Sequence, residues 1–202
     1  MVPVLFWFDP LCPWTWLTSR WMLEVEKVRD VRVRFRVMSL AVLNEASLPS
    51  DPKTFAEYWG PVRMMVATDV SYGPDAVRHL YSALGDLIHR ERLSINRDLY
   101  ARALTRAGLP HTLANAATHP FYDDLVRASH AEGLALSGED VGCPLLHLPG
   151  PDGQPVAFFG PVVTPYPRGD AAGRLWDAVS TAAATEGFFE LKRSRTRPPD
   201  VT

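Results

Sequence analysis

The alternation of apolar and polar residues in the first part of the chain predicts a strand, a helix and a second strand. Residues Val2–Phe8 form a short continuous apolar run, which is typical of a strand covered on both faces. Between about Pro13 and Val28 the apolar residues recur at helical spacing. From Val31 to Val37 they alternate with arginine, the period-two pattern of a half-exposed strand. This order predicts a right-handed crossover and a parallel strand pair.

The pattern changes after about Leu48, where residues 49–138 carry no strand signal. Apolar positions in this stretch recur at helical spacing, and prolines mark helix starts and loops. The stretch is therefore predicted to be an all-helical insertion, with the main domain divided into residues 1–48 and 139–202. The helically spaced apolar positions include Val77, Leu80, Tyr81, Leu84, Leu87, Ile88, Leu99, Ala103, Leu104, Leu113, Ala116 and Ala117.

Strand patterns return near the C-terminus. Residues Leu145–Leu148 and Val156–Phe159 predict two strands, joined by a turn at Gly150–Gly153. An amphipathic helix is expected from about Asp170 to Ala184, and the basic segment Lys192–Pro199 is expected to be a solvated terminus. Together these elements predict an α/β fold.

Composition narrows the class of protein. The chain has 202 residues, a hydrophobic content of 47% and a formal net charge of −2, so it can bury a full core and nothing in its charge favours nucleic acid. It contains neither a transmembrane run nor a leader pattern, so we expect a cytoplasmic protein without a membrane partner. Two cysteines cannot form a stabilising disulfide framework, so any importance they have is expected to come from reactivity. The oligomeric state is left open.

Several kinds of active site lack their sequence motifs. The chain has no nucleophile elbow, no Walker loop and no dinucleotide-binding glycine pattern. Its six histidines show no metal-ligand spacing, so we expect neither a metal site nor a tightly bound cofactor. Of the six histidines, His147 is the first candidate for a functional role, because it lies on a predicted strand close to Pro144.

Cys12 lies where a reactive thiol is favoured. It follows the first predicted strand and precedes the first predicted helix, with Pro13 at a suitable first helical position. The unpaired N–H groups and the positive end of a helix dipole favour thiolate over thiol. The alternative interpretation is a small buried hydrophobic residue, and the position alone does not separate the two.

Motifs along nearly the whole chain resemble those of a known family. They are Phe6–Trp14, Val37–Ala41, Trp59–Arg63, Val141–Pro144, Phe158–Pro161 and Phe188–Lys192. With these motifs the chain resembles the DsbA-like branch of the thioredoxin superfamily, and within it the cytoplasmic, mycothiol-dependent nitroreductase-type proteins. Kappa-class glutathione transferases and 2-hydroxychromene-2-carboxylate isomerases are related groups. The resemblance implies a thioredoxin-like fold with a large all-helical insertion.

The resemblance also implies a mechanism in which a first cysteine attacks and a second cysteine, three residues on, resolves the product. Here the second position is Thr15, which cannot form a disulfide. Its hydroxyl, one helical turn from Cys12, would either donate a hydrogen bond to the sulfur and favour the thiolate, or simply fill space. An ionised Asp9 would oppose the first effect by raising the pKa of Cys12.

Cys143 offers another partner for Cys12. In the superfamily the residue before a cis-proline faces the catalytic sulfur, and Pro144 occupies the matching place. We hypothesise that Cys143 replaces the missing resolving cysteine, which requires Cα atoms within about 7 Å. The competing interpretation is that the position before Pro144 requires only a small residue, and that cysteine meets this requirement.

Three classes of function follow from these residues. The first is a thiol oxidoreductase that uses mycothiol or glutathione as cosubstrate to reduce disulfides or small electrophiles, with Cys12, Thr15 and Cys143 as catalytic residues. The second is a thiol-assisted transferase or cis–trans isomerase, which needs no second cysteine in the motif. The third is a binding module without catalysis. For the enzymes, the expected substrate-binding residues are Pro13, Trp14, Pro144, Asn44, Trp59, Phe158 and Phe159.

Overall fold

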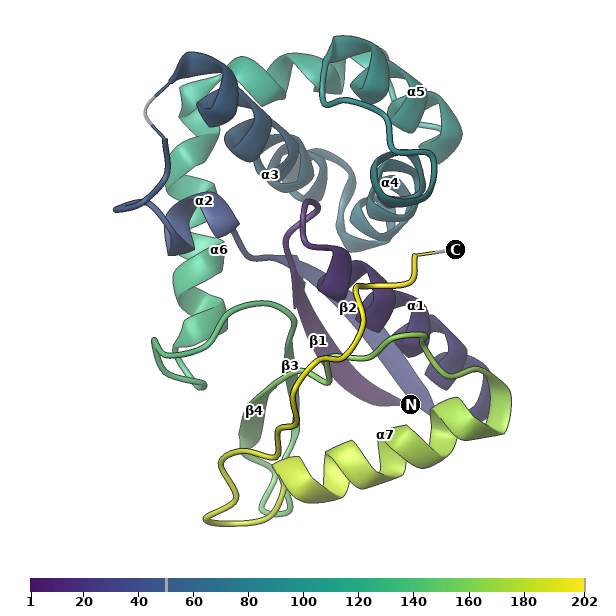
Figure 1. The fold of residues 1–202 in the computed structure, drawn as a ribbon. Helices are drawn as coiled ribbons and strands as arrows, with labels where there is room; N and C mark the ends of the chain where they lie inside the picture. Colours follow the sequence, from purple (N-terminus) through teal and green to yellow (C-terminus); the bar gives the residue numbers. More distant parts are fainter. Residues whose placement is uncertain (50, 202) are drawn as a thin grey trace.

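A four-stranded mixed sheet forms the centre of the computed structural model, which describes residues 1–49 and 51–201. The strands are β1 (Val2–Phe8), β2 (Val31–Val37), β3 (Leu145–Pro149) and β4 (Pro155–Phe159), in the order β2-β1-β3-β4. β1 pairs with β2 in parallel and with β3 in antiparallel orientation, and β3 pairs with β4 in antiparallel orientation. The predicted strands and the parallel first pair are confirmed (Figure 1).

The burial of each strand explains its hydrophobic pattern. β1 lies inside the sheet, and its residues Phe6, Trp7 and Phe8 are fully buried although they point to alternate faces. A continuous apolar run is therefore required there. β2 is an edge strand in which buried and exposed residues alternate along most of its length, as its period-two pattern predicts.

Two helices pack together on the same side of this sheet. They are α1 (Pro13–Val28) and α7 (Gly169–Ala183), and they lie side by side in Figure 1. The Trp21 Nε1 atom donates to the Ala172 carbonyl at 3.1 Å, and the Trp21 and Trp176 rings lie 6.3 Å apart. These contacts fix the final helix against the first.

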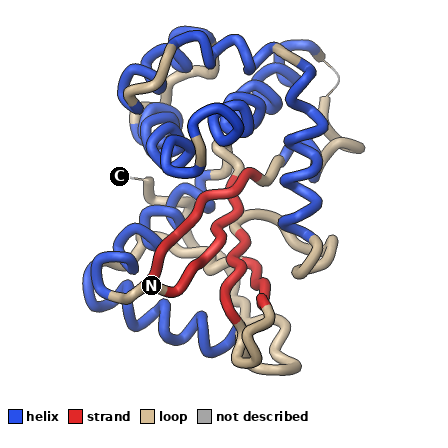
Figure 2. The backbone as a smooth tube through the Cα atoms, turned by 180° about the vertical axis from the view of Figure 1, so that it is seen from behind, coloured by secondary structure: helices blue, strands red, loops and turns tan. Residues whose placement is uncertain are grey.

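The long segment between β2 and β3 is helical, as predicted (Figure 2). No strand occurs between Val37 and Leu145 in the part of the chain that the structure describes. The division into domains at residues 48 and 138 stays a prediction. The helices of this segment are α2 (Leu40–Leu43), α3 (Pro52–Tyr72), α4 (Pro74–Gly85), a π-helix (Asp86–Arg90), α5 (Arg97–Ala107), two 3-10 helices (His111–Thr118 and Pro120–Tyr122) and α6 (Asp123–Leu134).

A partly buried ion pair connects α3 to α6 inside the helical segment. Arg63 is only 5% exposed, and its Nε and Nη2 atoms donate to the two carboxylate oxygens of Asp123 at 2.6 and 2.9 Å. Its guanidinium also lies 5.2 Å from the centre of the Trp59 ring. Trp59 is thus part of the packing of this layer.

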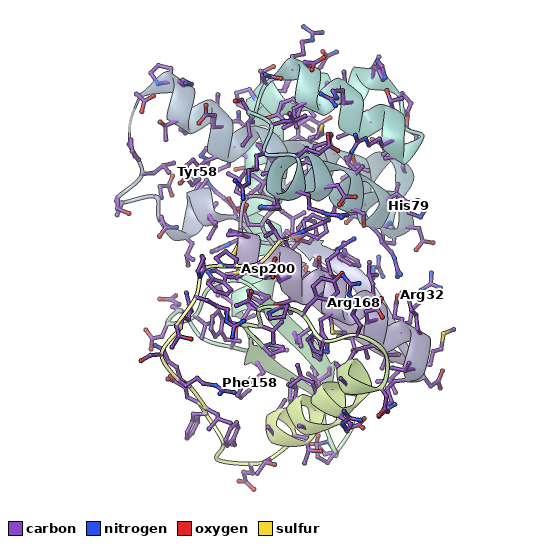
Figure 3. All side chains as sticks on the ribbon, turned by 45° about the vertical axis from the view of Figure 1, so that its right-hand side comes forward. Arg32, Tyr58, His79, Phe158, Arg168 and Asp200 are labelled. Atoms are coloured by element: carbon purple, nitrogen blue, oxygen red, sulfur yellow. The ribbon has the colours of Figure 1, made fainter. Side chains whose placement is uncertain are left out.

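The C-terminal tail is exposed along the segment that the sequence predicts to be solvated, and it is anchored on both sides of that segment. Phe188 stacks on Phe158 of β4 with ring centres 5.6 Å apart, and the Asp200 amide donates to the Thr164 hydroxyl at 2.8 Å. Residues 189–198 between these anchors are exposed, as predicted. The tail runs from the α7 side of the molecule toward α4, and Figure 3 labels Phe158 and Asp200 near its two anchored ends.

Candidate active site

Cys12 caps the N-terminus of α1, as the sequence predicts. Its backbone is extended, with φ −79° and ψ 111°, and Pro13 occupies the first turn. The Cys12 sulfur accepts a hydrogen bond from the Thr15 amide at 3.4 Å, and the Cys12 carbonyl accepts from the Trp16 amide at 3.0 Å. The sulfur thus occupies the place of a capping oxygen, where helix N–H groups stabilise negative charge.

The structure brings Cys143 and Pro144 to this helix start. The Cys143–Pro144 peptide bond is cis and leads into β3. The Cys12 Sγ atom lies 4.0 Å from the Cys143 carbonyl oxygen, although the two residues are 131 positions apart. Both cysteines are free thiols, each is 8% exposed, and both belong to one apolar cluster with Trp7 and Leu145.

The pKa values of the two thiols are shifted in opposite directions. A hydrogen bond from the Cys143 thiol lowers the pKa of Cys12 to about 6, helped by the Thr15 hydroxyl and by the amides of Thr15 and Trp14, while burial opposes the shift. The same hydrogen bond and burial raise the pKa of Cys143 well above its ordinary value. At neutral pH the negative charge therefore resides on Cys12, and Cys143 keeps its proton.

Thr15 is fully buried behind the Cys12 sulfur. Its Oγ1 atom makes no hydrogen bond of normal geometry within residues 1–49 and 51–201. The hydroxyl is nevertheless close enough to the sulfur to contribute to the low pKa of Cys12. A hydroxyl without another partner is free to turn its proton toward a thiolate. Whether it does so, or only fills space, stays a prediction.

Asp9 supports the loop that carries Cys12. Its carboxylate is fully buried and accepts hydrogen bonds from the Leu11 amide at 2.7 Å and the Leu40 amide at 2.6 Å. Burial raises the pKa of Asp9 to about 7, and the nearby Cys12 adds to this shift. Near neutral pH the carboxyl is thus only partly ionised, which weakens its opposition to the Cys12 thiolate.

The structure does not gather all the predicted substrate-binding residues around Cys12. Trp14 is half-buried and packs on the cluster that holds both cysteines. Trp59 is 2% exposed and belongs to the separate large core, so it is not brought to Cys12. Asn44 is exposed at the end of α2, where its side chain donates to the Leu40 carbonyl at 2.9 Å.

The predicted substrate-binding residues Phe158 and Phe159 do not pack on the Trp14 ring as its aromatic neighbours. Phe158 stacks on Phe188, and Phe159 is 37% exposed and pairs with Leu145 across the sheet. Neither ring stacks on Trp14 among the residues described in the structure. The group that covers the Trp14 ring is Arg195 of the tail, whose guanidinium carbon lies 4.9 Å from the ring centre. No sequence pattern indicated this contact.

His89 is a second residue that the sequence did not indicate. Its Nε2 atom lies 2.9 Å from the Pro10 carbonyl oxygen, and its ring stacks on Trp16 at 5.7 Å. Burial lowers the pKa of His89 to about 4, so it is neutral and donates to that carbonyl, which steadies the loop before Cys12. His147 instead bonds the Gly133 carbonyl at 3.0 Å and contacts Trp7, which makes it a packing residue.

Residues 1–49 and 51–201 contain neither a cluster of metal ligands nor a helix that could span a membrane. No group of three or more histidine, cysteine, aspartate or glutamate side chains is placed to hold a metal ion. Across the same residues, no helix has the length and apolar character to span a membrane.

Solved structures with a similar fold come from both oxidoreductases and an isomerase. The cytosolic disulfide reductase DsbM of Pseudomonas aeruginosa has 16% identity and a TM-score of 0.57, covering 90% of this chain and 100% of its own. The probable DsbA oxidoreductase SCO1869 of Streptomyces coelicolor has 16% identity and a TM-score of 0.58, with coverages of 99% and 94%. A 2-hydroxychromene-2-carboxylate isomerase has 14% identity and a TM-score of 0.60, with coverages of 89% and 93%. These likenesses establish the DsbA-like thioredoxin fold.

Sequence comparison identifies the family. The chain is 31% identical over 208 residues to the uncharacterized protein Rv2286c of Mycobacterium tuberculosis, covering 100% of this chain and 85% of that protein. Residues 11–193 match the family described as mycothiol-dependent nitroreductase Rv2466c, and this match includes both cysteines and the helical segment between them. Because this match covers most of the chain, the chain belongs to the Rv2466c-like mycothiol-dependent nitroreductase family.

Proposed function

We propose that the protein is a thiol-dependent oxidoreductase in which Cys12 is the nucleophile, Cys143 the resolving thiol, and a small thiol the electron donor. The observation that carries this proposal is the buried Cys12 sulfur at the N-terminus of α1, which lies 4.0 Å from the Cys143 carbonyl oxygen and shares one apolar cluster with the Cys143 thiol. The pKa of Cys12 is lowered to about 6 in this setting. A thiol with a pKa near ambient pH combines a large thiolate fraction with good nucleophilicity.

In the first step the Cys12 thiolate attacks a disulfide of the form R–S–S–R′. A mixed disulfide between Cys12 and R–S forms, the original S–S bond breaks, and R′–S⁻ leaves with the electron pair. The cis Pro144 shapes the backbone edge beside the sulfur, and the exposed part of Trp14 provides an apolar surface against which the substrate can lie. Pro13, Asn44 and Phe159 remain in the proposed substrate-binding set.

In the second step Cys143 resolves the mixed disulfide. The Cys143 thiol gives its proton to the departing R–S⁻ group and its sulfur attacks the Cys12 sulfur, so that a Cys12–Cys143 disulfide forms. Two molecules of the small thiol then reduce this disulfide and become oxidised themselves. Cys143 thus performs in this chain the step for which Thr15 lacks a sulfur, while the Thr15 hydroxyl stabilises the Cys12 thiolate.

Mycothiol is the small thiol that the family description favours. A DsbM structure of the same fold was solved with glutathione, which supports a small thiol as the chemical class. We propose a cytoplasmic location, where such thiols are kept reduced. The electron acceptor is proposed to be a disulfide or a small electrophile.

Intact-mass analysis with three proteins tests the resolving step. Each reduced protein is incubated with the disulfide of mycothiol or of glutathione. The wild type is expected to lose two hydrogens without retaining an adduct, Cys143→Ser to retain one thiol on Cys12, and Cys12→Ser to react with neither disulfide. A stable Cys12 adduct on the wild type, with no Cys12–Cys143 peptide after digestion, would exclude Cys143 as the resolving residue. An unreactive wild type would refute the proposed function itself.

Thr15 favours a second candidate, a thiol-assisted cis–trans isomerase or transferase. Such an enzyme needs only one sulfur at the helix start, because the small thiol adds to a conjugated carbon and later departs without net oxidation. The two candidates differ in thiol consumption. An oxidoreductase consumes thiol in proportion to product, whereas an isomerase needs only catalytic amounts of it.

A further inference from the structure

The tail carries a cation to the start of α1. The guanidinium carbon of Arg195 lies 4.9 Å from the centre of the Trp14 ring, in a cation–π arrangement. Trp14 packs on the apolar cluster that contains Cys12 and Cys143. The tail is anchored on both sides of this contact, by Phe188 on Phe158 and by Asp200 on Thr164. Arg195 is therefore held beside the candidate active site from a segment far along the chain.

The basic side chains between Lys192 and Arg197 form no ion pair with an acidic side chain among the described residues. Among the described residues, no ion pair or side-chain hydrogen bond involves any of them. Elsewhere most cations are neutralised, as Arg29 is by Asp177, Arg78 by Glu26 and Arg127 by Glu45. The described structure therefore holds four cations without an ion pair in one short exposed segment. Its four cations are Lys192, Arg193, Arg195 and Arg197.

The contact with Trp14 leaves the hydrogen-bonding capacity of Arg195 free. The guanidinium has five N–H donors, and none of them makes a hydrogen bond with another described residue. Those donors match a carboxylate in a bidentate geometry. Asp9, the carboxyl group next to Cys12 in this loop, is fully buried and bonded to two backbone amides, so it does not neutralise Arg195.

We infer that Arg195, held on Trp14, forms a subsite for a carboxylate on the substrate that reacts with Cys12. The inference rests on the proposed function and deepens it, because it names the charge of the substrate class. An aromatic or otherwise apolar substrate with one carboxylate would lie against the Trp14 surface and pair with the free edge of the guanidinium. Arg195 acts as a specificity-determining residue, since it selects the substrate and does not contact the reacting sulfur.

Two alkylating reagents that differ only in a carboxylate test this subsite. Iodoacetanilide is neutral, and 4-(iodoacetamido)benzoate carries a carboxylate at the far end of the same aromatic ring. In both reactions the Cys12 sulfur displaces iodide, and the rate is followed on the Cys12 peptide by mass spectrometry. The measured quantity is the ratio of the anionic to the neutral rate constant at low ionic strength.

Arg195→Gln is expected to lower this ratio by about threefold to tenfold, the effect of one nearby charge at the protein surface. Arg195→Lys should lower it less, because the charge stays while the planar fork is lost. Arg34→Gln is the matched control, since Arg34 is exposed on the edge strand β2 and makes no ion pair among the described residues. High salt should reduce the difference between wild type and Arg195→Gln.

A ratio that Arg195→Gln leaves within about twofold of the wild-type value overturns the subsite. If Arg195→Gln speeds the reaction of Cys12 with both reagents equally, the ratio is unchanged. The tail would then act by covering Cys12 sterically. An equal drop for Arg34→Gln also overturns it, because general charge then accounts for the effect. The proposed function has its own test in the same experiment. If wild-type Cys12 reacts slowly with the neutral reagent at pH 7, the proposed function is refuted, whatever the ratio is.

Discussion

At the scale of single residues, the candidate site depends on where one proton resides. Cys12 and Cys143 are equally buried, so burial alone would raise the pKa of both thiols. What distinguishes them is the helix start, because the amides of Trp14 and Thr15 stabilise a negative charge on Cys12 only. Cys143 then stabilises that charge as a donor, which raises its own pKa. One sulfur is thus prepared for attack and the other for a later step.

Thr15→Val tests whether the buried hydroxyl stabilises the thiolate. Removing a hydrogen-bond donor to a charged sulfur should raise the pKa of Cys12 by about one unit, or ~1.4 kcal/mol. The midpoint of the iodoacetamide rate against pH measures it, and the wild-type midpoint should lie at about 6. Thr15→Ser keeps the hydroxyl and serves as the control. Equal midpoints for the valine variant and the wild type would assign the hydroxyl to space filling.

Asp9→Asn tests the buried carboxyl group. Folding raises the pKa of Asp9 from 3.8 to about 7, so the folded state binds its proton more tightly than the unfolded state. The free energy of unfolding that Asp9 contributes is therefore fully present below pH 3.8 and is lost as the pH rises toward 7. The asparagine variant should lack this decline when urea unfolding is measured between pH 4 and 6.

The same variant should lose about 1–2 kcal/mol at pH 4, because both oxygens of a protonated carboxyl group can accept from the Leu11 and Leu40 amides, whereas the NH2 group of asparagine cannot accept at all. The pH range stops at 6 because ionisation of Cys12 adds a change of opposite sign above that value. A wild-type and a variant curve with the same slope would mean that Asp9 is ionised throughout.

At the scale of secondary-structure elements, close backbone approaches set the position of α1. Trp16 on α1 packs against the end of α4, where Gly85 has room only for hydrogen. His89 of the following π-helix stacks on the same indole and bonds the Pro10 carbonyl. The helical segment therefore supports the loop that carries Cys12 through one aromatic side chain. Leu134 of α6 also packs on the apolar cluster that holds both cysteines, so the helical segment contacts the site as well as its supporting loop.

Gly85→Ala tests this approach. An added Cβ atom would lie 2.2 Å from the Trp16 ring, so the ring or the helix must move. We expect a loss of about 1–3 kcal/mol in the free energy of unfolding from overpacking, although alanine is otherwise the better helix former. Gly133→Ala, whose Cβ would lie 3.0 Å from Trp7, should cost less. Urea titration of both variants measures the difference, and a Gly85→Ala protein as stable as wild type would contradict the packing.

At the scale of the whole molecule, periodic sequence patterns predicted the helices and strands, whereas contacts made by a single residue could not be predicted from the sequence. The apolar run of β1, the alternation of β2 and the helical spacing of the insertion each repeat a signal many times, so those assignments are confirmed. The resemblance, and not periodicity, indicated that Cys143 would face Cys12. The contact between Arg195 and Trp14 involves one residue from an exposed segment without a pattern, and no local signal marks such an anchor.

Trp59 shows that a sequence motif alone does not establish a role in substrate binding. Its motif is part of the family resemblance, and that suggested substrate binding. In the structure it stacks with Phe55, and the guanidinium carbons of Arg63 and Arg127 each lie 5.2 Å from its ring centre. A family motif can mark a packing position as well as a site, and only the three-dimensional arrangement separates the two.

A Cys12–Cys143 disulfide would join parts of the chain that are 131 positions apart and enclose the whole helical segment. Closing so long a loop is worth up to about 5 kcal/mol in chain entropy. The reduced protein has a compensating stabilisation, because folding lowers the pKa of Cys12 from 9.0 to about 6. That contribution is fully present above pH 9 and is lost as the pH falls through 6, whereas the oxidised protein lacks it altogether.

The stability advantage of the oxidised over the reduced protein should therefore shrink as the pH rises. Two pH units above the folded pKa of Cys12 correspond to about 3 kcal/mol, so the advantage at pH 5 should fall by about that amount at pH 8. Urea unfolding of diamide-oxidised and reduced protein at both pH values measures it. Cys143→Ser cannot form the bond and should show no advantage at either pH. An advantage of equal size at pH 5 and pH 8 would mean that folding does not stabilise the Cys12 thiolate, and the assignment of Cys12 as an activated nucleophile would fail with it.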